Sequence, residues 1–135
     1  MKIRNGFVSN SSSSSFIIVS KNGKLTKEKI MKVLNVNKKS PMYSMAEDVT
    51  KSMLYADKYT PEKFLDNYSY GDTIEEMEKE FKEDYPSYYK IYESAKKNNW
   101  TIYMGSADDV DDPILCEMDL HYEDNEIIIE KDGGY

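Results

Sequence analysis

A length of 135 residues, with 39% hydrophobic residues, 32% charged residues and a net charge of -7, is that of one acidic globular domain. No apolar run approaches the roughly 20 residues that cross a bilayer and no secretory leader is recognisable, which excludes a membrane-spanning protein and predicts a cytoplasmic one. Cys116 is the only cysteine, so an internal disulfide is excluded and a reducing compartment is favoured.

The N-terminal part of the chain predicts a strand followed by a helix. Five serines, Ser11–Ser15, lead into the run Phe16–Val19, whose aromatic and β-branched side chains are typical of a buried strand. Asn22–Gly23 favours a turn after this strand, because both residues tolerate a positive φ. Thr26 can then cap the free amides of a helix over about residues 27–36.

The middle of the chain contains further signals for helix starts. A Ser or Thr followed by Pro offers a side-chain oxygen to the free amides and a proline where no donor is required. An acid three residues before a second acid resembles a capping box. Together with apolar residues at three- and four-residue steps, these signals predict helices over about 41–57, from Pro61, from Asp72 with Glu75 up to Pro86, and over about 86–97.

After Asn99 the pattern becomes typical of strands. Trp100–Met104 is rich in aromatic and β-branched residues, and Ile114–Leu120 starts apolar and then alternates. Glu123–Asn125 is a plausible hairpin turn into the strand Glu126–Glu130. Residues 131–135 form a loose tail in this prediction.

This order of elements predicts an α+β fold in a single domain that covers residues 1–135. Because the strands lie towards the two ends of the chain, we expect about four mainly antiparallel strands, one N-terminal and three C-terminal, in a common sheet. Four or five helices are expected to pack on one face of that sheet.

The charge of the chain is unevenly distributed. Residues 1–40 contain nine basic residues and one acid, a balance of +8, whereas residues 41–135 contain nine basic residues and 24 acids, a balance of -15. Charge complementarity within one fold explains this asymmetry, and so does an anionic partner for the basic part.

The opening of the chain resembles a known group of proteins. Ile3–Asn10, the five serines and Phe16 are similar to the start that many short, uncharacterised proteins of tailed bacteriophages share. The resemblance covers about the first 20 residues, implies a phage or prophage origin and hence the cytoplasm of a bacterial host, and implies no catalytic residue.

The serine run is the first candidate site. As a loop over residues 9–15 it is a flexible connector, a phosphate-binding loop for a nucleotide or phosphorylated small molecule, or an acceptor for modification. It lacks the Gly and Lys of a Walker motif and leads into a strand rather than a helix. The candidate ligand-binding residues are Lys2, Arg4, Ser11, Ser12, Ser13, Ser14 and Ser15.

A tyrosine stripe is the second candidate site. Tyr85, Tyr88, Tyr89 and Tyr92 follow helical spacing after an acidic helix, and they form either a partner-binding surface or part of the core. The acids that precede the stripe disfavour nucleic-acid binding through these rings.

The sequence contains no recognisable metal site, cofactor site or catalytic group. Pro113 interrupts the acidic segment Asp108–Asp112 where a calcium-binding loop would continue. Cys116 and His121 are five residues apart and would point to opposite faces of a regular strand, which disfavours a metal or nucleophilic pair. We therefore expect no enzymatic activity.

Three functions remain open from the sequence. The first is a non-enzymatic binding protein that acts on a host or viral protein through an acidic, tyrosine-bearing helical face. The second is sequestration of a nucleotide or phosphorylated ligand by the basic, serine-rich N-terminal part. The third is an inhibitor that imitates DNA, which the lysines mixed into the acidic helices disfavour.

Overall fold

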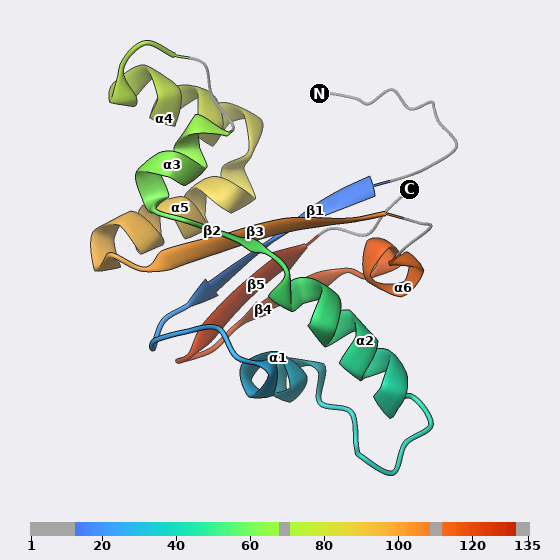
Figure 1. Cartoon of the computed structure of the whole chain (residues 1–135). Coiled ribbons are helices and arrows are strands. Elements are labelled where there is room, and N and C mark those ends of the chain that lie inside the picture. Colours follow the sequence, from blue (N-terminus) through green and yellow to red (C-terminus); the bar gives the residue numbers. More distant parts are fainter. Residues whose placement is uncertain (1–12, 68–70, 109–111, 132–135) are drawn as a thin grey trace.

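In the computed structural model, which describes residues 13–67, 71–108 and 112–131, five strands form one antiparallel sheet (Figure 1). The strand order is β2-β3-β1-β5-β4, so the N-terminal strand lies in the middle. The strands are β1 (Ser13–Ser20), β2 (Asp57–Tyr59), β3 (Thr101–Asp108), β4 (Leu120–Glu123) and β5 (Ile127–Lys131).

Helices cover both faces of the sheet. Figure 1 shows α1, α2 and α6 on one face and α3, α4 and α5 on the other. The hydroxyls of Thr26 and Thr60 accept backbone amides at the starts of α1 and α3, as predicted, whereas α4 is capped by Thr73, one residue after the predicted Asp72. The helices are α1 (Lys27–Leu34), α2 (Tyr43–Leu54), α3 (Pro61–Asp66), α4 (Ile74–Asp84), α5 (Pro86–Asn98) and α6 (Pro113–Glu117).

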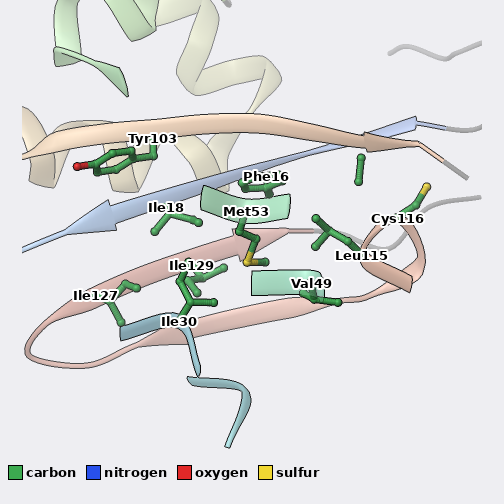
Figure 2. Close-up of a cluster of buried hydrophobic side chains, with 11 residues drawn as sticks. Phe16, Ile18, Ile30, Val49, Met53, Tyr103, Leu115, Cys116, Ile127 and Ile129 are labelled. Carbon is green, nitrogen blue, oxygen red and sulfur yellow. The ribbon is translucent and has the colours of Figure 1, made fainter. Parts of the chain in front are cut away.

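Each face of the sheet has its own hydrophobic core. The first, which we call the aliphatic core, lies under α1, α2 and α6 (Figure 2); its fully buried residues include Phe16, Ile18, Ile30, Met53 and Ile129. The second, the aromatic core, lies under α3, α4 and α5, and its buried residues include Ile17, Val19, Phe64, Phe81 and Tyr92. Consecutive residues of β1 alternate between the two cores, because successive side chains of a strand point to opposite faces.

The α+β class, the common sheet and the hairpin are confirmed. β1 pairs with β5 so that Ile18 lies opposite Ile129, and β4 and β5 form an antiparallel pair. The carboxylate of Asp124 closes the hairpin turn by accepting the amides of Glu126 and Ile127 at 2.7 and 3.0 Å.

The expected packing of the helices on one face is wrong. Phe16–Val19 and Ile127–Ile129 are buried at every position, and such uninterrupted burial requires cover on both faces of a strand. The single-face arrangement would have left every second residue of these strands in solvent.

Two other element boundaries differ from the prediction. Ile114–Leu120 is not one strand: Pro113 occupies the first turn of the short helix α6, and β4 starts only at Leu120. β2 was not expected, because Asp57 was assigned to the end of a helix, whereas α2 ends at Leu54.

Lys131, placed in the loose tail by the sequence, is instead fully buried at the end of β5. Its ammonium group donates to the carbonyl oxygens of Cys116 and Met118, at 2.9 and 2.8 Å. Ser14 also donates its hydroxyl to the Cys116 oxygen, at 3.1 Å. These contacts satisfy the carbonyls left free at the end of α6 and attach that helix to β1 and β5. Residues 132–135 of the predicted tail lie outside the described residues.

The basic N-terminal part and the acidic remainder pair with each other in this fold. Ion pairs join Lys21 to Glu123 at 2.7 Å, Lys27 to Glu47 at 3.2 Å and Lys32 to Glu126 at 3.2 Å. Each connects a lysine of residues 1–40 with an acid of residues 41–135, which is the arrangement expected of charge complementarity within one fold.

Candidate functional site

The serine run is only partly a loop. Ser13, Ser14 and Ser15 belong to β1 and pair with Asp108, Ala107 and Ser106 of β3. The strand therefore begins before the apolar run, because β3 is long enough to pair with the serines as well. The remaining predicted ligand-binding residues, Lys2, Arg4, Ser11 and Ser12, lie outside the described residues.

The tyrosine stripe divides between core and surface. Tyr92 is 1% exposed, Tyr88 and Tyr89 are half-buried, and Tyr85 is 40% exposed at the junction of α4 and α5. Tyr85, Tyr89 and Tyr92 surround the ring of Phe81 at centroid distances of 5.9, 6.1 and 5.8 Å. The inner end of the stripe is therefore structural, and only its outer end is available to a partner.

A polar group fixes the inner end of the stripe. Glu78 of α4 accepts hydrogen bonds from the Tyr92 hydroxyl and the Lys96 ammonium, both at 2.7 Å. The bond from Lys96 holds the pKa of Glu78 below its usual value, although partial burial opposes this effect. Burial, and then the bond to Glu78, raises the pKa of Tyr92 far above its usual value. Tyr92 therefore stays a neutral hydrogen-bond donor between the two helices.

The two candidate sites meet at Tyr88. Its hydroxyl donates to the carbonyl oxygen of Ser15 at 3.3 Å, and its ring stacks on Tyr85 with centroids 6.3 Å apart and an interplanar angle of 16°. The structure therefore brings the end of the serine run beside the exposed end of the tyrosine stripe. The sequence places them 73 positions apart.

A hollow opens on the sheet beside this meeting point, and we call it the β2 hollow. It has a volume of about 490 Å³ and borders the aromatic core through Met104. Its described lining contains hydroxyls, one amide and one carboxylate, but no lysine, arginine or histidine. The lining residues are Ser15, Tyr55, Asp57, Tyr59, Asn67, Met104, Gly105 and Ser106.

The sequence singled out only Ser15 among these lining residues. Tyr55, Asp57 and Ser106 had no signal, since β2 is three residues long and its position beside β3 follows from the topology alone. Gly105 is required here for a packing reason: a Cβ atom at this position would lie 2.6 Å from the ring of Phe16.

A second hollow, of about 320 Å³, lies between α5 and the β4–β5 hairpin. Ser87, Lys90 and His121 line it, and the Nδ1 atom of His121 lies 2.6 Å from a carboxylate oxygen of Glu130. Cys116, in contrast, is buried in the aliphatic core on the opposite face of the sheet. The structure therefore does not bring Cys116 and His121 together.

The described residues form no recognisable metal centre. In residues 13–67, 71–108 and 112–131, no group of three or more His, Cys, Asp or Glu side chains is placed to hold an ion. In the acidic segment, Asp108 ends β3 and Asp112 accepts the hydroxyl of Ser52 at 2.6 Å, whereas residues 109–111 lie outside the described part of the chain. None of the described helices has the length and apolar character that crossing a membrane requires.

Comparison with known proteins assigns no family. Neither family models nor curated proteins nor solved structures give a match to this chain. The function proposed below depends on the surface chemistry of the described residues and on the resemblance of the opening segment.

Proposed function

We propose that the chain is a non-enzymatic binding protein that acts on a host or viral protein through an acidic, tyrosine-bearing helical face. This face consists of the exposed side of α4 together with Tyr85 and Tyr88. The observation that carries the proposal is Tyr85, which is 40% exposed although its ring is held by Phe81 and Tyr88. A tyrosine held in this way contacts a partner with little loss of side-chain entropy.

The charge of α4 indicates the kind of partner. The helix contains six acids and two lysines, and Glu78 is the acid whose carboxylate turns inward to Tyr92 and Lys96. The other acids of α4 are exposed, and two of them, Glu83 and Asp84, directly precede Tyr85 at the end of the helix. A basic surface on the partner would be attracted to this face, and the attraction would speed association.

The phage-like opening supports a partner from the host or the virus. The described residues support the ligand alternative less, because the β2 hollow offers a carboxylate and no basic side chain to an anion. The DNA-mimic alternative is also supported less, because the exposed residues Lys79 and Lys82 lie among the acids of α4 and Lys96 pairs with Glu78.

Affinity capture with matched variants tests the proposal. Tagged protein would be incubated with lysate of the bacterial host, and bound proteins would be quantified by mass spectrometry. We expect one stoichiometric partner, which Tyr85→Ala should bind roughly 30-fold more weakly, because a tyrosine hot spot contributes about 2 kcal/mol or more. Met42→Ala is the matched control, since Met42 is 50% exposed at the start of α2.

A second variant separates binding from packing. Glu83→Gln with Asp84→Asn removes two exposed charges at the end of α4 and leaves the aromatic rings in place. It should slow association and make it less dependent on salt. The proposal fails if no stoichiometric partner is captured, or if the Tyr85 and Met42 variants retain the partner equally.

A further inference from the structure

Several polar side chains of the β2 hollow make no hydrogen bond or ion pair within the described part of the chain. Tyr55 is 82% exposed, more than any other large hydrophobic residue of the described chain, and Asp57 is exposed beside it. In the described part of the chain, neither side chain has a hydrogen bond, ring contact or ion pair. The hydroxyls of Tyr59, Ser15 and Ser106 are also without a partner there. The hollow therefore combines aromatic rings, hydroxyls and a carboxylate that has no counter-ion.

The strand geometry directs the neighbouring lysine of β2 away from the carboxylate of Asp57. Asp57 and Tyr59 lie opposite Met104 and Ile102, on the face of the aromatic core, whereas Lys58 lies opposite Tyr103, on the face of the aliphatic core. Since successive side chains of a strand alternate, Lys58 points away from the hollow. A carboxylate is also uncommon in a strand, so Asp57 is not explained by sheet formation.

The hollow adjoins the face described above. Ser15 lines the hollow through its exposed side chain, and its carbonyl oxygen accepts the hydroxyl of Tyr88 at 3.3 Å. A partner that covers Tyr85 and Tyr88 would therefore extend directly over Ser15. The net charge of -7 of the chain favours a basic partner, and Asp57 is the only charged residue in the described lining of the hollow.

We propose that the β2 hollow receives an arginine side chain of the partner protein; this inference rests on the proposed function and specifies the chemistry of the partner. A guanidinium group is planar, so it can stack on the ring of Tyr55 while its N–H groups reach the carboxylate of Asp57. Its remaining donors match the free hydroxyls of Ser15 and Ser106. An anionic group would find only neutral donors in the described lining, beside the negative charge of Asp57.

A titration in the absence of any partner tests the site directly. Amide chemical shifts of the full chain would be followed by NMR while N-acetyl-arginine amide is added. N-acetyl-citrulline amide, which has nearly the same shape and no charge, is the control ligand. We expect saturable shifts confined to β2 and to the amides around Ser15 and Ser106 with the arginine probe. The citrulline probe should bind about tenfold more weakly, as expected when an exposed ion pair and a cation–π contact are lost.

Matched variants then locate the site. Asp57→Asn should weaken binding of the arginine probe about threefold, because only the exposed ion pair is lost, whereas Asp48→Asn, which neutralises an exposed acid of α2, should leave it unchanged. Equal binding of the two probes, or equal effects of the two variants, would overturn the inference.

The two proposals fail in distinguishable ways. If arginine does not bind in the hollow but capture still depends on Tyr85, only the arginine site is lost. If arginine binds in the hollow but no protein is captured, the proposed function is lost and with it the assignment of that arginine to a partner.

Discussion

The two faces of the sheet differ in whether their polar side chains are hydrogen-bonded inside the protein or line a hollow at its surface. Under the aliphatic core, buried polar groups are bound internally: Lys131 and Ser14 hold the end of α6, and Thr50 donates to the Ala46 carbonyl at 2.8 Å. On the aromatic face the Tyr92 hydroxyl is also bound internally, by Glu78, but both hollows border this core, through Met104 and Ile128. One face therefore mainly stabilises the fold, whereas the other leaves chemistry accessible to a partner.

The largest expected effect tests whether the two cores unfold together. Phe81→Ala should lower the free energy of unfolding by about 4 kcal/mol, because a fully buried ring that contacts three tyrosines is lost. Met53→Ala in the aliphatic core should cost about 3 kcal/mol. Urea unfolding followed by circular dichroism and by the fluorescence of Trp100, which packs on the aromatic core, should give coincident transitions. Separate transitions would show that the two faces are independent units.

A smaller effect should distinguish the polar groups of the aliphatic face. Lys131→Met keeps the length of the side chain but leaves the Met118 carbonyl without its donor, so stability should fall by about 2 kcal/mol. Lys63→Met on the exposed side of α3 is the control and should change stability little. An unchanged melting midpoint for Lys131→Met would show that the buried ammonium group contributes no net stability.

Helix caps provide a matched pair of variants on the two faces. Thr26 caps α1 with a 3.3 Å bond to the Lys29 amide, and Thr73 caps α4 with a 3.2 Å bond to the Glu76 amide. Replacement of either threonine by Ala should cost about 1 kcal/mol in urea unfolding. Thr26→Ser and Thr73→Ser retain the hydroxyl and should restore most of the loss; failure to do so would assign the effect to the methyl group.

The smallest effect concerns the pH dependence of the aromatic face. The pKa of Glu78 lies below 4.5 in the fold, so its contribution to stability is present above about pH 4.5 and is lost as pH falls through the lowered pKa. Glu78→Gln should therefore cost less than about 1 kcal/mol at neutral pH, and progressively less as the pH falls through the lowered pKa of Glu78. Unfolding measured across this range should show the two curves converging, and parallel curves would contradict the assigned cause.

Local patterns were sufficient to predict most elements of the fold. The runs in β1 and β5, the caps at Thr26 and Thr60 and the hairpin turn depend on neighbouring residues, and each was found near its predicted position. The unbroken apolar runs Phe16–Val19 and Ile127–Ile129 were also a signal for two-sided packing, but we expected one covered face because the helices are consecutive in the sequence. β2 had no local signal, since its three residues become a strand only through pairing with β3.

The candidate site was harder to predict for a related reason. Tyr85 and Tyr92 share one helical periodicity, and their exposures of 40% and 1% depend on how α3 and α4 pack against α5. The β2 hollow combines Ser15, Asp57 and Ser106 from three strands. No spacing along the chain reveals such a combination, because it depends on strand order.

The central position of β1 has a consequence for synthesis. Val19 pairs with Ile102 and Ile128, so its partners follow roughly 80 and 110 positions later in the chain. At translation rates of about 5 to 20 residues per second, the ribosome needs roughly 5 to 20 seconds to deliver the second partner. For most of this interval the apolar run of the nascent chain has neither neighbouring strand, and it lacks β5 until the end, so we expect newly made protein to depend on chaperones or on rapid elongation for its yield.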